Sequence, residues 1–510
     1  MKALLSAYNR AGLVEFARSI SKAGFGILST GGTGKELSGA GISVQQVSEY
    51  TGSPEILDGR VKTLHPKVHG GILARRSLQS HTSQMAEHGI DSIDLVAVNL
   101  YPFVQTVSRP GVTLDDALEN IDIGGPTIIR AAAKNFPDVI VVVDPADYGW
   151  IAERIASGGA GAIALEERKA LARKAFQHVS VYDSAVSRYL GESADPFAAE
   201  VGLGFTKLGD LRYGENPHQR GAVYADPLAA GGIVRAEQLN GMEMSYTNYL
   251  DAEAAWKTVK EFASTAVCIV KHTNPCGVAI HADQAQAYRN ALAGDPISAY
   301  GGIVGFNTAV TTETAAAMKG VLYHIIVAPD YEPEALAIFR KRNKDTRVLK
   351  VQRSTGSLND LEVRLVSGGA LLQTADNKEE DFSTWKVVTN VRPTAEQISD
   401  LHFATKVLPH IKSNAVVLAK ERTMVGMGAG QPNRVTSIHL ALRSSGAKAK
   451  GSVMASDAFL PNVDNVELAH QGGIVAISQA GGSKLDQDMI DTANRLGVAM
   501  VLTGVRHFTH

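Results

Sequence analysis

A lysine and a histidine stand side by side where an apolar run meets a turn rich in proline and glycine. Val270 ends the run, and Lys271 and His272 follow it directly. Histidine exchanges protons near neutral pH, and a neighbouring lysine can stabilise developing negative charge. The pair predicts proton transfer, although a lone histidine is also common as a structural residue. Nothing near Cys276, in the same turn, indicates an activated thiolate.

A tyrosine, an acid and a second lysine form another candidate group. Tyr101 follows the apolar run 94–100, and Asp122 precedes a Gly-Gly turn. Pro126 suits the first turn of a helix, and Lys134 would lie near the end of that helix. These residue types can organise proton movement, but each also has a structural explanation when taken singly.

Two segments have the chemistry of an anion site. Residues 29–34 end an apolar run in small residues and open a helix, which offers free N–H groups to a phosphate. They lack the Gly-Lys-Ser/Thr ending of a P-loop, and a tight glycine turn is the alternative reading. Residues 58–71 gather cations and two histidines, with Arg60 able to fork onto a phosphate. Pro66 and the glycines predict a shaped loop without a regular helix. A His-x3-His metal pair would need a helix, so no metal site is predicted.

The elements that must position these residues alternate in type. The runs 25–29, 94–100 and 139–143 are continuously apolar, which is typical of parallel strands covered on both faces. Helical patterns separate them, so the first part of the chain is predicted to be α/β. A long amphipathic helix is expected over residues 165–190.

The remainder of the chain is again predicted to mix helices and strands. The break at residues 191–196 suggests a domain boundary. Residues 341–350 are basic and predict a solvated surface segment. Strands are expected at 266–270, 302–306, 325–328, 415–419 and 474–477.

Composition narrows the class of protein. The chain has 510 residues, enough for two or more domains. Its formal net charge of −2 gives no reason to expect nucleic acid or an anionic membrane as a partner. Two cysteines provide no disulfide framework. No apolar stretch approaches the roughly 18 residues of a membrane span. We therefore expect a cytoplasmic protein.

Six motifs occur in a fixed order from one end of the chain to the other, and together they are highly specific. The chain resembles the bifunctional purine biosynthesis family, which has 5-aminoimidazole-4-carboxamide ribonucleotide (AICAR) formyltransferase and IMP cyclohydrolase activities. The motifs that carry the resemblance are residues 62–67, 99–103, 121–127, 211–219, 271–277 and 506–510.

The resemblance implies an α/β protein with two domains. Residues 1–193 would form a methylglyoxal-synthase-like cyclohydrolase with a parallel sheet. Residues 194–510 would form a transformylase of two cytidine-deaminase-like subdomains without the deaminase zinc. The protein would transfer a formyl group from the cosubstrate 10-formyltetrahydrofolate to AICAR and then close formyl-AICAR to IMP with loss of water. No metal would be needed, and the family implies a homodimer that shares its transformylase sites.

The resemblance also implies the site residues. In the cyclohydrolase, the phosphate would be held by Arg10, Thr30, Gly31, Gly32, Thr33, Arg60 and Thr63, and catalysis would fall to Lys62, Tyr101, Asp122 and Lys134. In the transformylase, the catalytic residues would be Lys271, His272 and Asn414, with Arg212, Tyr213 and Arg506 at the nucleotide and Phe459 and Asp464 near the folate.

Departures from the family pattern leave two other functions open. Tyr8 and Ala11 stand where the family usually has hydroxyl residues near the phosphate, and Asn462 replaces an aromatic residue near the folate. One alternative is therefore a transformylase with an impaired cyclohydrolase. The other is a non-catalytic sensor of purine nucleotides.

Overall fold

A computed structural model describes residues 1–191, 196–354 and 361–510. The chain divides into two compact units. The first contains residues 1–206 with 226–228, and the second contains residues 207–225 with 229–510. The boundary expected between residues 193 and 194 lies outside the described residues.

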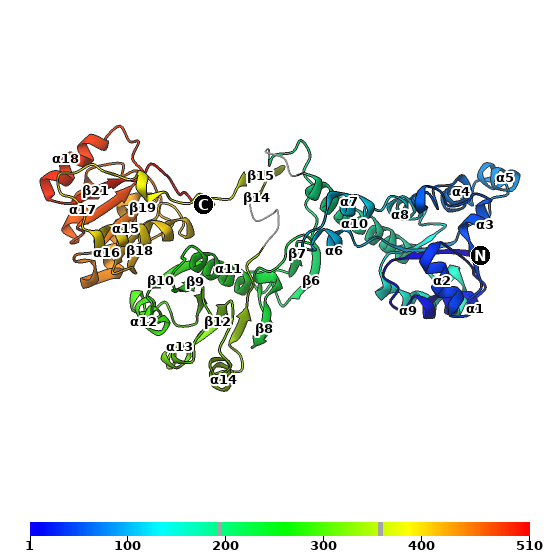
Figure 1. Ribbon diagram of the computed structural model, residues 1–510, viewed down its shortest axis with the longest axis horizontal. Coiled ribbons are helices and arrows are strands. Elements are labelled where there is room, and N and C mark those ends of the chain that lie inside the picture. Colours follow the sequence, from blue (N-terminus) through cyan, green and yellow to red (C-terminus); the bar gives the residue numbers. More distant parts are fainter. Residues whose placement is uncertain (192–195, 355–360) are drawn as a thin grey trace. The chain divides into compact units, whose positions relative to one another are not determined.

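The first unit is built on a five-stranded sheet in the order β3-β2-β1-β4-β5, in which every pairing is parallel. The strands are short and, apart from β3, mostly apolar, and helices surround them in the blue and cyan part of Figure 1. The predicted parallel sheet is confirmed. Its strands are β1 (Lys2–Ala7), β2 (Gly26–Ser29), β3 (Val44–Gln46), β4 (Leu95–Asn99) and β5 (Ile140–Val142).

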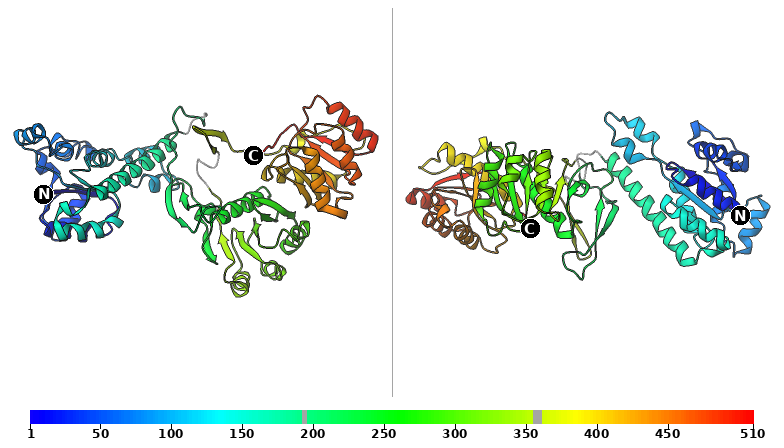
Figure 2. Two further views of the ribbon diagram at one scale, coloured as in Figure 1. Left: turned by 180° about the vertical axis from the view of Figure 1, so that it is seen from behind. Right: turned by 90° about the horizontal axis from the view of Figure 1, so that it is seen from below.

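The expected long helix is α10 (Leu165–Leu190), which is a single unbroken helix (Figure 2). The Glu167 carboxylate accepts the Ala164 N–H at 2.8 Å and so caps its start. The other helices of the unit are α1 (Leu13–Lys22), α2 (Gly31–Gly39), α3 (Val47–Thr51), α4 (Pro66–Leu73), α5 (Gln79–Glu87), α6 (Phe103–Val107), α7 (Leu114–Glu119), α8 (Gly124–Lys134) and α9 (Tyr148–Gly158).

The prediction that residues 58–71 contain no regular helix was wrong, because α4 begins at Pro66. Proline is tolerated in the first turn, where its missing N–H has no helical partner. His65 caps the helix by accepting the Lys67 N–H at Nδ1, 3.1 Å away. Gly71 is required by close packing, since a Cβ there would lie 2.5 Å from the Asp91 carbonyl oxygen.

The second unit contains a twelve-stranded mixed sheet in the order β16-β21-β20-β19-β17-β18-β10-β9-β11-β12-β13-β8. The order reads the same outward from the central β18–β10 pair in both directions, so the two halves repeat one arrangement. The first half has β8 (Glu237–Asn240), β9 (Ala266–Lys271), β10 (Asn274–Ile280), β11 (Gly302–Phe306), β12 (Tyr323–Ala328) and β13 (Arg347–Lys350), and the second has β16 (Lys386–Val387), β17 (Val416–Lys420), β18 (Thr423–Gly428), β19 (Val453–Ser456), β20 (Ala476–Gln479) and β21 (Ala499–Leu502).

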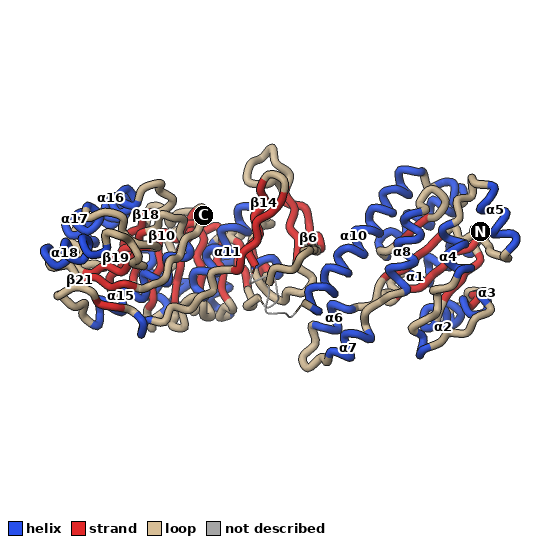
Figure 3. The backbone as a smooth tube through the Cα atoms, turned by 90° about the horizontal axis from the view of Figure 1, so that it is seen from above, coloured by secondary structure: helices blue, strands red, loops and turns tan. Residues whose placement is uncertain are grey.

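Helices cover both faces of this sheet, and Figure 3 shows blue helices against red strands throughout the unit. One apolar core joins α11 (Tyr246–Lys260) and α15 (Ala395–Val407) to a single face. Capping boxes begin both helices. The opposite face carries α12 (Gln284–Gly294), α13 (Thr312–Ala317) and α14 (Pro333–Arg342) in the first half, and α16 (Arg434–Ser445), α17 (Asp464–Gln471) and α18 (Asp486–Leu496) in the second.

The expected α/β architecture is confirmed. The first unit has a parallel sheet, and the repeat divides the sheet of the second unit into two halves. The prediction of a solvated segment at residues 341–350 was correct only for its first half. Residues 341–345 are mostly exposed, whereas β13 follows them and Arg347 is only 7% exposed. Two hairpins stand apart from the large sheet. They are β6 (Thr206–Leu211) with β7 (Gly221–Ala225), and β14 (Leu361–Val366) with β15 (Gly369–Thr374).

Candidate active sites

A cavity of about 660 Å³ opens in the first unit where β1, β2 and β4 end. The carboxyl edge of a parallel sheet is the usual place for ligands in such folds. Most of the residues implied for the cyclohydrolase line this cavity. They are Arg10, Thr30, Gly31, Gly32, Arg60, Lys62, Thr63, Tyr101 and Asp122.

One end of this cavity has the geometry of an anion site. Helix α2 begins at Gly31, so its first N–H groups are free to bind a ligand. Two cations lie against the turn. A Cβ on Gly31 would be 3.6 Å from Lys62 Nζ, and one on Gly32 would be 2.5 Å from Arg10 Nη2. Glu36 balances Arg10 at 2.9 Å. Glycine at position 32 thus permits the close approach of Arg10, whereas a Cβ at position 31 would only touch Lys62.

Thr33 differs from its neighbours because its hydroxyl is already engaged. It donates to the Ala7 carbonyl and accepts the Ala7 N–H, each at 3.1 Å. The residue is buried and does not line the cavity. In this structure Thr33 joins α2 to β1.

Asp122 lines the same cavity and lies just before α8. One carboxylate oxygen accepts the Gly125 N–H at 2.8 Å, and the other accepts the Tyr101 N–H at 3.4 Å. Burial raises the pKa of the Asp122 carboxyl, and these two hydrogen bonds oppose that rise. Such an acid is suited to exchange a proton with a substrate.

Lys134 is not brought to this group. It ends α8, an 11-residue helix whose two ends are about 16 Å apart. Its side chain lines a separate cavity of about 690 Å³, together with Arg130, Lys169 and Arg173. The structure therefore groups Lys62, Tyr101 and Asp122, and separates Lys134 from them.

In the second unit, Lys271 ends β9, and His272 and Thr273 form the two-residue turn to β10. Both turn residues have left-handed backbones, with φ of 51° and 61°. Such a turn suits a tight hairpin, and Asp251 of α11 stabilises it by accepting the Thr273 N–H at 2.7 Å. The Lys271 ammonium donates to the Tyr300 carbonyl at 2.8 Å.

His324 of β12 converges on the same lysine across Gly301. A Cβ on Gly301 would lie 3.2 Å from Lys271 Nζ and 3.5 Å from the His324 ring. Burial and the positive charges of Lys271 and Arg347 lower the pKa of His324. The imidazole is therefore held neutral beside the lysine ammonium.

Arg212 and Tyr213 lie within electrostatic range of Arg347. Burial, followed by the charge of Arg212, lowers the pKa of the Arg347 guanidinium. The Arg347 side chain donates to the Glu243 carbonyl at 2.7 Å and 3.0 Å. Arg347 therefore interacts electrostatically with both Arg212 and His324.

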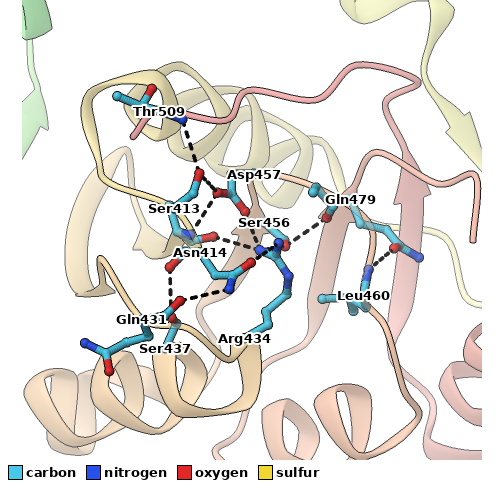
Figure 4. A network of polar contacts seen from close by, with 12 residues as sticks. Ser413, Asn414, Gln431, Arg434, Ser437, Ser456, Asp457, Leu460, Gln479 and Thr509 are labelled. Atoms are coloured by element: carbon cyan, nitrogen blue, oxygen red, sulfur yellow. Dashed lines mark hydrogen bonds and ion pairs between the residues drawn. The ribbon is translucent and has the colours of Figure 1, made fainter. Parts of the chain in front are cut away.

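Asn414 lies in the second half of this unit, in the polar network of Figure 4. Its amide donates to the Gln431 carbonyl at 2.8 Å, and its oxygen accepts from Arg434 Nη2 at 2.8 Å. The other arm of Arg434 pairs with buried Asp457. Asp457 also accepts the Ser413 hydroxyl at 2.6 Å. The side chain of Asn414 is therefore fixed at both ends.

The remaining implied residues are dispersed. Arg506 lines a cavity of about 910 Å³ that also reaches Thr273, and it stacks on Phe508 with 4.6 Å to the ring centre. Phe459 is exposed, and Asp464 begins α17. No hydrogen bond or ion pair within the described residues joins either to Asn414. Burial raises the pKa of the Cys276 thiol to about 12, which disfavours the thiolate that a nucleophile would need.

Comparison with known proteins identifies the family. The model described as AICARFT/IMPCHase bienzyme matches residues 132–444, and an MGS-like domain matches residues 12–127. The chain belongs to the AICARFT/IMPCHase bienzyme family. It is therefore a bifunctional enzyme with formyltransferase and cyclohydrolase activities, and formyl transfer implies a folate-type donor.

Individual relatives cover the whole chain. The bifunctional purine biosynthesis protein purH of Dictyostelium discoideum is 49% identical over all of both chains. PurH of Oceanobacillus iheyensis is 47% identical over all of this chain and 99% of its own. A solved structure described as "Crystal structure of ForH" is 38% identical over 38% of this chain and 99% of its own, with a TM-score of 0.35.

Within residues 1–191, 196–354 and 361–510 of the bienzyme, no group of three or more His, Cys, Asp and Glu side chains is arranged to hold a metal ion. No helix in these ranges combines the length and apolar character needed to cross a bilayer.

Several residues that contact the implied site residues of the bienzyme were not singled out from the sequence alone. Asp457 follows a buried strand, the same signal that singled out Lys271, and could have been found. His324 interrupts an apolar strand, which is also a visible signal. Arg434 and Asp251 lie on helices, where a charged residue gives no sign of pointing inward.

Proposed function

We propose that this chain carries out the last two chemical steps of purine-ring assembly at two separate sites, one in each unit. The observation that supports this best is the convergence of Lys62, Tyr101 and Asp122 on one cavity of the first unit. The second unit has polar groups of its own, one around Lys271 and another around Asn414. AICAR and formyl-AICAR each carry a phosphate group, and each unit offers cations that could bind it.

In ring closure, the carboxamide nitrogen of formyl-AICAR attacks the formyl carbon, and water then leaves to give IMP. The amide is a weak nucleophile, so holding the reacting atoms close supplies much of the rate. Arg10 and the start of α2 bind the phosphate, and Lys62 stabilises the oxyanion. Tyr101 and Asp122 move the protons, and the raised pKa of Asp122 suits a group that gives and takes a proton.

In formyl transfer, the AICAR amine attacks the formyl carbon of 10-formyltetrahydrofolate, and tetrahydrofolate leaves. His272 takes the proton from the attacking amine and returns it to the folate nitrogen as tetrahydrofolate leaves. Lys271 stabilises the developing oxyanion, and Asn414 positions the substrate through its two fixed hydrogen bonds. Arg212, Tyr213 and Arg506 bind the nucleotide, and Phe459 and Asp464 lie near the folate.

The remaining assignments follow the family. The cyclohydrolase would occupy residues 1–193 and the transformylase residues 194–510. Thr30, Gly31, Gly32, Arg60 and Thr63 would complete the phosphate site, with Thr33 supporting it. We propose a cytoplasmic homodimer without nucleic acid or membrane partners, and sedimentation of the purified protein would measure the dimer.

A pair of variants tests the division of labour. His272→Ala should lose formyl transfer from 10-formyltetrahydrofolate while still closing supplied formyl-AICAR. Asp122→Asn should lose ring closure while still producing tetrahydrofolate. If each folded variant loses both activities, the two-site assignment is wrong. If the unaltered protein binds IMP but catalyses neither reaction, it is a nucleotide sensor.

A further inference from the structure

Tyr182 lies in the middle of α10 and contacts the segment that carries Asp122. Its hydroxyl accepts the Asp122 N–H at 2.8 Å and donates to the Asn120 carbonyl at 3.2 Å. Among the described residues, the Asp122 N–H has no other hydrogen-bond partner. The phenol therefore bridges Asn120 and Asp122 in the segment between α7 and α8.

We propose that Tyr182 is a positioning residue for ring closure, which fixes the Asp122 carboxyl at the edge of the cavity through this hydroxyl. The inference rests on the proposed role of Asp122. The ring of Tyr182 is itself fixed, since it is buried and packs edge-on against Phe103 with 6.1 Å between ring centres. A hydroxyl on such a rigid ring defines one position for the backbone of Asp122.

The hydroxyl keeps its proton under all ordinary conditions. Burial raises the pKa of Tyr182 to about 12. The phenol can therefore donate to Asn120 and accept from Asp122 at the same time throughout the pH range of the enzyme. The side chain of Asp122 depends on this backbone, because its carboxylate must also meet the N–H groups of Gly125 and Tyr101.

Tyr182→Phe removes the hydroxyl and keeps the ring. We expect kcat for closure of formyl-AICAR to fall on the order of 10- to 100-fold, the effect of misplacing a catalytic group by about 1 Å. KM should change little, because Tyr182 does not line the cavity and its hydroxyl bonds only Asn120 and Asp122 among the described residues. The acid limb of the kcat profile should move to lower pH, since a looser Asp122 is better hydrated and its pKa falls.

Tyr189→Phe is the matched control. Tyr189 lies two turns further along α10 and packs edge-on against the same Phe103, at 5.5 Å. Its hydroxyl forms no hydrogen bond with any described residue. This variant should keep the kcat and the pH profile of the unaltered protein.

The affinity for IMP, measured by calorimetry on each variant, separates positioning from damage to the fold. Unchanged affinity in Tyr182→Phe together with a reduced kcat and a shifted acid limb supports the inference. A normal kcat and pH profile in Tyr182→Phe overturns it, as does an equal loss in Tyr189→Phe or a loss of IMP binding. If the unaltered protein closes no ring, the proposed function itself falls.

Discussion

The buried fork of Arg434 offers a quantitative test of how Asn414 is held. One nitrogen, Nη1, pairs with Asp457 and donates to the Ser456 hydroxyl at 2.9 Å. The other, Nη2, donates to the Asn414 side-chain oxygen at 2.8 Å. Arg434→Lys keeps the charge but has a single nitrogen, which cannot reach both acceptors in this geometry. Because Asp457 is negatively charged and Asn414 is neutral, the lysine should pair with Asp457, and Asn414 should lose its hydrogen bond from residue 434.

The magnitude follows from the bond that is lost. A hydrogen bond to a charged group contributes about 1.5–3 kcal/mol. If Asn414 needs that bond to position the substrate, kcat for formyl transfer should fall about 10- to 150-fold. Arg434→Met should be worse for stability, since Asp457 would remain buried without its cation, at a cost of about 3–5 kcal/mol.

The assay is release of tetrahydrofolate from 10-formyltetrahydrofolate and AICAR, with closure of supplied formyl-AICAR measured on the same preparation. Closure should be unchanged, because Arg434 lies in the other unit. Thermal unfolding should show a smaller loss of stability for Arg434→Lys than for Arg434→Met. If Arg434→Lys transfers the formyl group at the normal rate, the hydrogen bond to Asn414 has no role in catalysis.

Two further variants test other contacts. Gly125→Ala would put a Cβ 2.5 Å from Asp122 Oδ2 and 2.8 Å from Leu100 Cδ2, so ring closure should fall at least about tenfold with formyl transfer intact; normal closure would show that the carboxylate can move without loss. The second variant changes His507, which is buried between Asp376 and Glu380, each 2.7 Å away. Burial alone would lower the pKa of His507, but its hydrogen bonds to these two carboxylates raise it. A raised histidine pKa stabilises the fold fully below about pH 6.5, and that stability is lost as pH rises through the folded value. The melting temperature should therefore fall above pH 6.5, and His507→Gln should remove that slope; an identical slope in the variant would assign the pH dependence to other groups.

The sequence was most informative where one strong pattern decided the local structure. The strands in the continuously apolar runs of the first unit and the long helix over residues 165–190 were predicted from the pattern of apolar residues. The helix at Pro66 was missed for two reasons. Proline does not oppose a helix in its first turn, and glycine is required within this helix where another segment of the same chain packs closely against it. The repeat in the second unit could not be seen, since its halves share the order of their strands but no short motif.

The sites show the same limit. Motifs named residues singly, and the structure shows that Lys62, Tyr101 and Asp122 share a cavity while Lys134 lines another. Tyr182 falls within the amphipathic helix expected over residues 165–190, but no pattern in the sequence reveals where a hydroxyl on a helix will point. Contacts of this kind depend on how distant elements pack.

The most direct test of two activities in one chain is a single incubation of the purified protein with AICAR and 10-formyltetrahydrofolate. Tetrahydrofolate is followed by absorbance and IMP by chromatography. We expect both to accumulate in equal amounts, since each formyl group transferred ends in a closed ring. Accumulation of formyl-AICAR without IMP would show that the first unit does not catalyse closure, and the absence of both products would contradict the assignment of this chain as an enzyme of purine synthesis.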